Sequence, residues 1–304
     1  MPGVPSPGQE EIMAFVSRIC VVLLSCASIL AQTAKLQPQP NAATSLQFTT
    51  LEVPGSFGTY AEGINNLGDI VGGYTTGNLL SGFVYTGGKF RTISCPNAKF
   101  YTRALAINDS GVIVGDCDFV GFVYENGEFT YVAYPGRHTQ STELDGINNQ
   151  GLIVGGASTG SNKGVVFVYD HGTFSKISSN DYPGGINNAN TVASSNCNAH
   201  TQLCVGGVYP QAKDGWKKHQ RVVYPQASST NLVGINDNGD LAGVWLDKNG
   251  QPGNFVYSSS AKTFTAFVVG TSVESNVAGL NNSGEVVGSY FDGTTYYGFY
   301  GNLQ

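Results

Sequence analysis

Glu143 and Asp145 stand two residues apart in the chain. Paired carboxylic acids can act as acid and base in glycoside cleavage when they flank the bond and one has a raised pKa. No nucleophile motif, metal triad or phosphate-binding loop accompanies them, so the sequence predicts no cofactor and no metal site. Since acidic residues also occur by chance in an acidic chain, Glu143 and Asp145 are catalytic candidates only if the protein is an enzyme.

A second set of candidates comes from comparing repeated segments of the chain. The residue three positions before a recurring Gly/Ala-Ile/Leu-Asn motif is polar or aromatic in every copy: Tyr60, Arg103, Glu143, Tyr182, Asn231 and Asn276. We expect these six side chains to form a ligand-binding ring at the mouth of a central channel. A wet channel that is simply lined by polar residues is the alternative.

The residue before each ring position is polar and nearly uniform: Thr59, Thr102, Thr142, Asp181, Thr230 and Ser275. This uniformity predicts a strand-end hydrogen bond that the copies share. Trp245 and Tyr290, at the end of the following strand, are further ligand-binding candidates because their rings suit sugars or peptide side chains. Packing between neighbouring repeats is the alternative, and for Trp245 it is the favoured one, since large aromatic side chains usually bury their area.

The elements that must position these residues repeat six times. Copies of the motif begin at residues 63, 106, 146, 185, 234 and 279, and each continues through an Asn/Asp-x-Gly turn, degenerate in the fourth copy, into a short apolar strand. Each copy resolves into four apolar runs separated by turn residues, without helical periodicity. A period near 40 residues with four strands predicts an all-β fold, a six-bladed β-propeller of four-stranded antiparallel blades.

The two ends of the repeat region predict how the ring closes. Residues 46–55 resemble the fourth strand of a blade, whereas the sixth copy stops after its third strand. We expect the N-terminal strand to complete the last blade, which removes two open sheet edges.

The hairpins carry a family resemblance. The pattern resembles the HAF-repeat extracellular proteins of bacteria, whose repeat joins a Gly-Ile-Asn-x-x-Gly-x-Val-Gly hairpin to a His-Ala-Phe strand, and the resemblance covers residues 46–304. The His-Ala-Phe half is altered, since only the Phe persists and the fourth copy lacks it. The resemblance implies secretion and a repeat architecture, and it transfers no catalytic residue.

The N-terminus and the cysteines predict an oxidising location. Residues 1–31 read as a signal peptide, with Arg18 before an apolar run, and residues 32–45 as a disordered leader. Lipoprotein anchoring through Cys26 is the less favoured alternative. The four remaining cysteines predict a Cys197–Cys204 disulfide and possible pairing of Cys95 with Cys117. A zinc site that recruits His200 is disfavoured because a fourth ligand is missing.

Charge and composition limit the partners. The net charge of −6 and the pI near 5.1 argue against nucleic-acid binding, and no segment is long enough for a comfortable membrane span. We expect a secreted or periplasmic monomer that binds an extracellular glycan or peptide. A polysaccharide hydrolase or lyase and a structural scaffold without a small ligand are the alternative functions.

Overall fold

The computed structural model describes residues 44–159, 163–179, 181–198, 200–217 and 220–303. Within these ranges all the regular secondary structure is β-strand. The described residues include no helix that is long and apolar enough to cross a membrane. The predicted signal peptide and all but two residues of the predicted leader lie outside the described residues. The two exceptions, Thr44 and Ser45, form β1, so strand structure begins just before the predicted boundary at residue 46.

Four consecutive strands pair antiparallel in each of the first three groups. The first group contains β3 (Gly58–Ile64), β4 (Ile70–Thr76), β5 (Leu79–Thr86) and β6 (Lys89–Ile93). The second contains β7 (Thr102–Ile107), β8 (Ile113–Cys117), β9 (Val120–Glu125) and β10 (Glu128–Val132). The third contains β11 (Thr139–Ile147), β12 (Ile153–Thr159), β13 (Lys163–Asp170) and β14 (Thr173–Ser179).

The remaining groups modify this plan at their outer strands. The fourth contains β15 (Asp181–Ile186), β16 (Thr191–Cys197), β17 (Cys204–Ala212) and two short strands that both pair with β17, namely β18 (Gly215–Trp216) and β19 (Gln220–Val222). The fifth contains β20 (Ser229–Ile235), β21 (Leu241–Leu246), β22 (Pro252–Ser258) and β23 (Thr263–Val268), with β1 (Thr44–Ser45) parallel to β23. The sixth contains β24 (Glu274–Leu280), β25 (Glu285–Phe291) and β26 (Tyr296–Asn302), and β2 (Gln47–Leu51) pairs antiparallel with β26.

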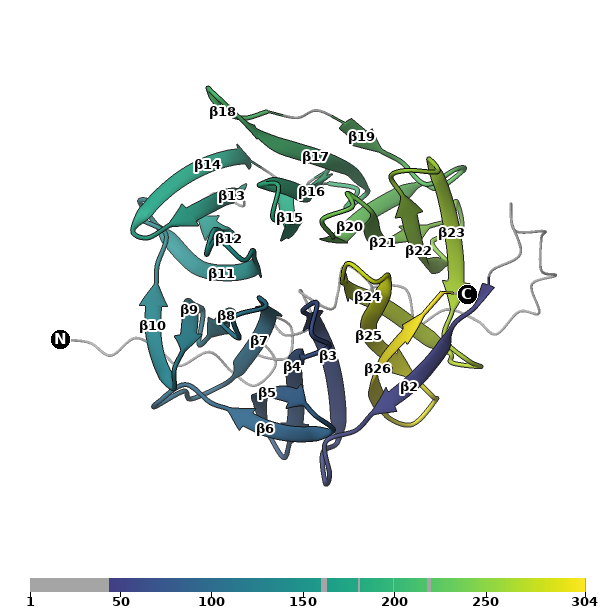
Figure 1. Cartoon of the computed structure of the whole chain (residues 1–304), viewed down its shortest axis with the longest axis horizontal. Coiled ribbons are helices and arrows are strands. Elements are labelled where there is room, and N and C mark those ends of the chain that lie inside the picture. Colours follow the sequence, from purple (N-terminus) through teal and green to yellow (C-terminus); the bar gives the residue numbers. More distant parts are fainter. Residues whose placement is uncertain (1–43, 160–162, 180, 199, 218–219, 304) are drawn as a thin grey trace. The chain divides into compact units, whose positions relative to one another are not determined.

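Figure 1 shows the groups arranged around a centre that the first strand of each group faces: β3, β7, β11, β15, β20 and β24. The fourth strands, such as β6, β10 and β14, lie on the outside. A single parallel bridge between Gly58 and Tyr296 links the first group to the sixth, so these two groups count as one hydrogen-bonded sheet. The outer strand of the sixth group therefore comes from the N-terminal side of the chain.

A glycine and a phenylalanine explain much of the repeat pattern. The glycine that ends each Val-Gly step pairs across the sheet with the Phe of the third strand, as Gly155 does with Phe167. A Cβ on Gly155 would lie 2.4 Å from the Glu143 carbonyl oxygen and 2.8 Å from Cζ of Phe167, so only glycine fits beneath this ring. The same Phe is fully buried in five groups: Phe83, Phe122, Phe167, Phe255 and Phe299.

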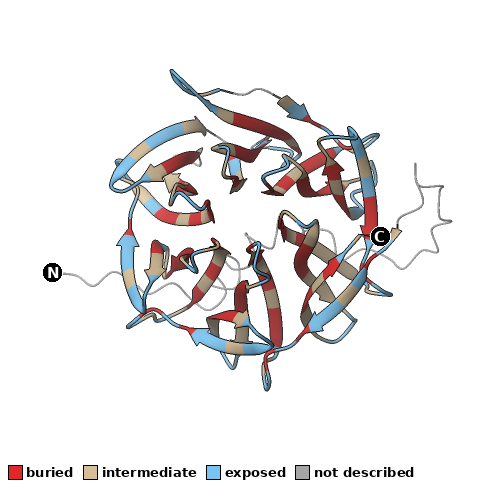
Figure 2. Cartoon of the chain, in the orientation of Figure 1, coloured by how far each residue is buried: buried red, intermediate tan, exposed pale blue. Residues whose placement is uncertain are grey.

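The fourth group lacks this Gly-Phe pair. Ser194 replaces the glycine, and its partner on β17 is Gly207 instead of Phe. No Phe ring therefore packs on this step of the second strand, and the sequence of this copy departs from the repeat at both positions. Figure 2 shows that buried residues concentrate on the inner and middle strands, whereas the outer strands are largely exposed.

The predicted strand-end hydrogen bond is present in four groups. The hydroxyl of Thr102 accepts the backbone N–H of Cys95 at 3.0 Å, just beyond the outer strand of the preceding group. Thr59, Thr142 and Thr230 make the equivalent bond. In the fourth group Asp181 is buried instead and accepts hydrogen bonds from Ser194, Asn196 and Tyr209.

Asparagines in the turns between the first and second strands connect successive groups. The side-chain amide of Asn65 donates to the backbone carbonyl of Asn108 at 3.1 Å, and the equivalent bonds continue through Asn148, Asn187 and Asn236 to Asn281. Asn281 then donates to the carbonyl of Asn65 at 3.2 Å, so the series returns to its start. Each of these amides is buried, where an unmade hydrogen bond is costly.

A second series of hydrogen bonds runs through the next residue of each turn. The backbone N–H of Asn66 donates to the Asp109 carboxylate at 2.9 Å, and corresponding bonds lead through Asn149, Asn188, Asp237 and Asn282 back to Asn66. The turns surround a small cavity of about 70 Å³, lined by this segment of every group. This end of the inner strands is therefore closely hydrogen-bonded, and the ring positions lie toward the other end.

Candidate functional site

The six predicted ring residues occupy equivalent places on the innermost strands. Arg103 pairs with Asp116, Glu143 with Gly156 and Tyr182 with Ser195, each on the adjoining second strand. Tyr182 is 50% exposed, and the other five are partly buried. The structure gives these positions a common register, but it brings only some of their side chains into contact.

Arg103 links two of the neighbouring groups through ion pairs. Its guanidinium lies 2.8 Å from Asp116 on β8 and 3.5 Å from Glu143 on β11. The ring of Tyr101 lies beside the guanidinium, 5.5 Å from its centroid, and the Tyr101 hydroxyl donates to Asp116 at 2.7 Å. Asp116 is therefore a fully buried carboxylate that is held by an arginine and a tyrosine.

More carboxyl groups than cations gather here. Glu62 and Asp145 interact electrostatically with Arg103, and Asp145 also with Glu143 and Asp116. We call Glu62, Asp116, Glu143 and Asp145 the carboxylate cluster. Burial raises the pKa of Asp116 to about 7, with Arg103 opposing the rise and Glu143 adding to it. Burial likewise raises the pKa of Asp145, and of Glu62, because the charged form is poorly solvated.

Asp145 has a further feature. Its Oδ2 is inaccessible to solvent and has no hydrogen-bond partner among the described residues. A Cβ on Gly156 would lie 3.9 Å from this oxygen and 3.4 Å from Pro183, so the missing side chain of Gly156 leaves room beside the carboxyl group. Pro183 and the exposed Tyr182 are consecutive residues of the neighbouring strand β15.

The loop before Arg103 is held in place from the second strand. A disulfide joins Cys95 to Cys117, so the predicted pairing of these two cysteines is confirmed. The next residue, Asp118, accepts backbone N–H groups of Lys99, Phe100 and Tyr101. Asp118 and Phe119 have φ values of 46° and 74°, which side-chain-bearing residues rarely adopt. Such strain is held only by strong surrounding constraints, and here those constraints fix Tyr101 against Asp116.

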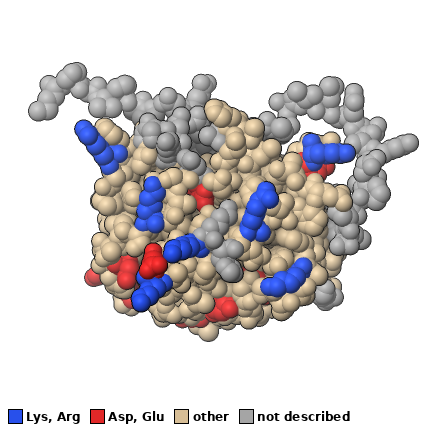
Figure 3. Space-filling model, turned by 90° about the horizontal axis from the view of Figure 1, so that it is seen from above, with Lys and Arg blue, Asp and Glu red and all other residues tan. Residues whose placement is uncertain are grey.

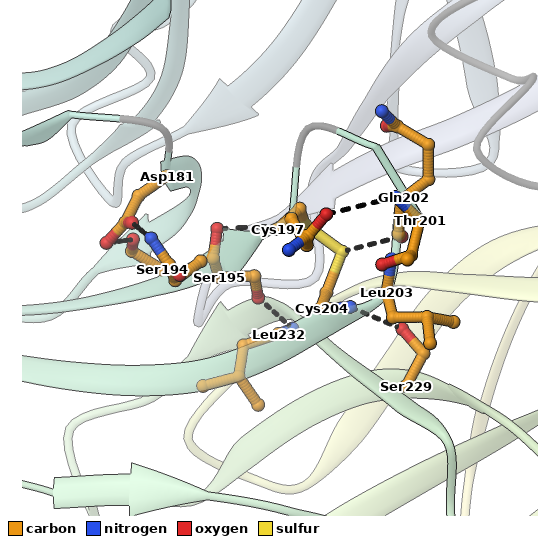
Figure 4. Close-up of a disulfide and its surroundings, with 12 residues drawn as sticks. Asp181, Ser194, Ser195, Cys197, Thr201, Gln202, Leu203, Cys204, Ser229 and Leu232 are labelled. Carbon is orange, nitrogen blue, oxygen red and sulfur yellow. Dashed lines mark hydrogen bonds between the residues drawn. A yellow bond between two sulfur atoms is a disulfide. The ribbon is translucent and has the colours of Figure 1, made fainter.

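The predicted disulfide between Cys197 and Cys204 is also present, so the zinc alternative with His200 is wrong (Figure 4). It joins β16 to β17 at the last pair of their ladder. The backbone N–H of Cys204 donates to the Ser229 hydroxyl at 2.8 Å, and that of Leu232 to the Ser195 hydroxyl at 2.7 Å. The disulfide therefore fixes a hairpin that is bonded to the fifth group. Two disulfides are typical of an oxidising extracellular or periplasmic environment.

The two aromatic candidates outside the ring are placed differently. Trp245 is 7% exposed and stacks on Tyr224 with ring centroids 4.7 Å apart, so the packing alternative describes this residue. Tyr290 bonds through its hydroxyl to Thr50 and lies edge-on to Phe48, both on β2. Trp245 is thus part of the core, and Tyr290 helps to attach the N-terminal strand.

Asp116, Glu62 and Tyr101 belong to the charged network but were not among the predicted site residues. Asp116 could have been found by aligning the second strands, because the other groups have Gly73, Gly156, Ser195, Val244 or Ser289 at its register position. Tyr101 precedes the repeated segment, and no periodic signal marks it.

Charged side chains elsewhere form no comparable concentration on the side that Figure 3 shows. Lys and Arg residues lie apart from one another there, among uncharged residues, and some stand beside acidic ones. In the fourth group, Lys217 pairs with Asp214 at 3.4 Å in an exposed hairpin.

Comparisons with known proteins identify no family: no family model and no curated protein matches the chain. Among solved structures, the chain is similar to SapL1, a lectin in complex with alpha methyl fucoside, with a TM-score of 0.51 and 9% identity over 79% of this chain and 90% of that one. An arginine-to-alanine mutant of AofleA from Arthrobotrys oligospora is similar with a TM-score of 0.54 and 12% identity, over 86% of this chain and 88% of that one. TolB from Acinetobacter baumannii is similar with a TM-score of 0.50 and 10% identity, over 83% of this chain and 67% of that one. At these identities the likeness shows a β-propeller-like, all-β fold and nothing about function.

Proposed function

We propose that residues 46–304 form a closed, six-bladed β-propeller of the HAF-repeat type that is secreted and binds a carbohydrate as a monomer. The closure is supported by the pairing of β2 with β26 and by the asparagine series that returns from Asn281 to Asn65. The secreted location is supported by the two disulfides.

The observation that carries the binding function is the charged network of Arg103, Asp116 and Glu143. The register position of Asp116 is occupied by glycine, serine or valine in the other groups, so the scaffold does not need charge there. Arginine and carboxylate groups offer fixed, charge-assisted hydrogen bonds, which suit the many hydroxyls of a sugar. The half-exposed ring of Tyr182 lies on the adjoining inner strand and provides a flat apolar face for a pyranose.

The likeness to the lectin SapL1 is compatible with this function but shows only the fold. A peptide is the alternative ligand, because charged groups beside an exposed tyrosine also suit peptide side chains. A glycan array that includes peptides on the same surface separates the two ligand classes.

Tyr182→Ala tests the proposed surface. Tyr131, on the outer strand β10, is also 50% exposed and is therefore a matched control. We expect Tyr182→Ala to weaken binding of array-selected glycans by about tenfold or more, as the loss of an aromatic contact of about 1.5 kcal/mol implies. Tyr131→Ala should bind like the wild type. Equal binding by all three proteins would contradict the proposed site.

A polysaccharide hydrolase or lyase is the second candidate, and one observation favours it. Asp145 has a raised pKa, which is a property expected of a general acid. Asp145 also lies two residues from Glu143 on the same strand. In an enzyme, Glu143→Gln and Asp145→Asn should each abolish release of reducing or unsaturated ends from the bound polysaccharide. Cleavage that survives both substitutions would exclude these carboxylates as catalytic residues.

A further inference from the structure

The carboxylate cluster holds more carboxyl groups than Arg103 can neutralise when they ionise. Arg103 is within ion-pair distance of Asp116 and Glu143, and it is the one cation among the charges that act on Asp145. Glu62, on the preceding inner strand, is a fourth carboxyl group that interacts with the same arginine. Burying uncompensated carboxylates is unfavourable, so a bound cation would be stabilised strongly at this position.

A separate observation shows that the cluster is incomplete in its hydrogen bonding. Oδ2 of Asp145 is buried and has no donor among the described residues. The backbone of Gly156 adjoins the carboxyl group, and glycine leaves the space beside Oδ2 free of a side chain. Buried polar atoms normally have partners, so the hydrogen bonding of the Asp145 carboxyl group is incomplete within the chain.

The cluster can be reached through Glu143. The side chain of Glu143 is 22% exposed, that of Arg103 is 16% exposed, and Asp116 is fully enclosed beneath them. A ligand therefore meets Glu143 first. The carboxyl group of Asp145 lies two residues further along the same strand. Tyr182 stands on the next inner strand with half of its surface exposed.

The donor set favours an ammonium group over a metal ion. In the part of the chain that the structure describes, no three His, Cys, Asp or Glu side chains are placed so that they could share a metal ion. A protonated amine needs no such convergence, because it carries one charge and up to three donors that separate acceptors can satisfy. A sugar ring attached to that amine would also offer an apolar face to Tyr182.

We propose that the carboxylate cluster binds the protonated amine of an amino sugar, with the ammonium against Glu143 and Asp145 and the sugar ring against Tyr182. This inference rests on the proposed carbohydrate-binding function and names its ligand class. Binding then places a cation close to Asp145 and Asp116, whose pKa values are raised by burial, so complex formation releases protons from these carboxyl groups.

Isothermal titration calorimetry with three tetrasaccharides tests the ligand class. The glucosamine tetramer carries free amines, whereas the N-acetylglucosamine and glucose tetramers, also β-1,4-linked, are neutral. We expect the amine-bearing tetramer to bind at least about tenfold more tightly than either neutral one, since a charged hydrogen bond contributes about 1.5 to 3 kcal/mol. Repeating the titration at about pH 5.5, where the amines of the ligand are already protonated, in buffers of different ionisation enthalpy should show proton release with the amine-bearing tetramer alone.

Two conservative variants locate the effect. Glu143→Gln and Asp145→Asn keep the side-chain shape, and each should remove about tenfold of the preference for the amine-bearing tetramer while neutral tetramers are unaffected. Asp170→Asn changes an exposed carboxylate on β13 and should leave all affinities unchanged. Thermal melts of each variant verify folding.

The outcomes separate this inference from the proposed function. Glycan binding without preference for the amine, or a preference that survives both variants, would overturn the inference and leave the proposed function standing. Failure of every glycan to bind, on the array and in the calorimeter, would overturn both. Equally tight binding of a tetralysine peptide would overturn the assignment to an amino sugar, because the cluster would then recognise any ammonium group.

Discussion

The side-chain amide of Asn281 donates a hydrogen bond to the backbone carbonyl of Asn65 at 3.2 Å, across a sequence separation of 216 residues. The other asparagine bonds of the series span 39 to 49 residues, from one turn to the next. The same side chain also holds its own turn, since Asn281 Oδ1 accepts the backbone N–H groups of Ser283 and Glu285. One residue type thus shapes each hairpin and attaches it to the next group.

Asn281→Ala should lower the free energy of unfolding by about 2 to 4 kcal/mol. The substitution removes several hydrogen bonds of a 5% exposed residue and leaves the carbonyl of Asn65 without its donor. Chemical denaturation measures the loss. Asn249→Ala is the control, because Asn249 is exposed and its amide contacts only Asp247 in its own turn. Equal losses for the two variants would show that the series of bonds adds no stability.

Replacing two adjacent glycines on β12 by alanine should change stability by very different amounts. Gly155→Ala places a methyl group 2.4 Å from the Glu143 carbonyl oxygen and 2.8 Å from Phe167, so we expect a loss of more than about 3 kcal/mol. Gly156→Ala makes only an ordinary contact at 3.4 Å with Pro183 and should change stability by less than about 1 kcal/mol. Thermal melts of both variants check this. Similar melting temperatures would contradict the role assigned to Gly155 beneath the Phe ring.

The sequence predicted the parts of this fold that recur. Hairpins, strand order and the strand-end threonines repeat in register, and each copy therefore serves as an internal control for the others. Both disulfides were predicted from the even number of cysteines that remain after the signal peptide. The Gly-Phe pair was visible as two separate motifs, but their contact was not, because it lies across two strands of one sheet.

The charged network was only half predicted, for a physical reason. Arg103 and Glu143 stand at a repeated position, whereas Asp116 and Tyr101 act through contacts that occur in one group alone. Aligning the copies marks Asp116 as a departure from the repeat, but it does not show which side chains Asp116 contacts. Trp245 is buried because it stacks on Tyr224, which lies between β19 and β20, and sequence spacing does not encode this contact.

Removing the two disulfides should have unequal effects. The Cys95–Cys117 pair spans 22 residues and the Cys197–Cys204 pair spans 7, so loop entropy predicts losses of about 3.4 and about 2.5 kcal/mol when each pair is changed to alanine. Denaturant unfolding of the two double variants measures both. The larger loss is expected for Cys95→Ala/Cys117→Ala, which also frees the loop that carries Tyr101. The reverse order would contradict the predicted dependence on loop length.

The carboxylate cluster should make the protein more stable in mild acid than in mild base. Burial raises the folded-state pKa of Asp116 to about 7, and that of Asp145 and Glu62 also rises, whereas an unfolded chain has carboxyl pKa values near about 4.

Between these values the folded state binds more protons than the unfolded state, so stability is greatest below about pH 4 for these groups and falls as pH rises toward about 7. Each such group contributes up to about 1.4 kcal/mol per pH unit. Carboxyl groups with lowered pKa values, such as Asp109, act in the opposite sense, but only below about pH 4.

Thermal melts from pH 5 to pH 8 at constant ionic strength should therefore show a falling melting temperature. Asp145→Asn should flatten this dependence and raise stability at pH 8, since the amide removes a buried charge and no longer titrates. Glu128→Gln, on an exposed side chain of β10, should keep the wild-type slope. A melting temperature that rises over this range would mean that the cluster is fully compensated in the folded state, and an unchanged slope in Asp145→Asn would remove that residue from the proton uptake.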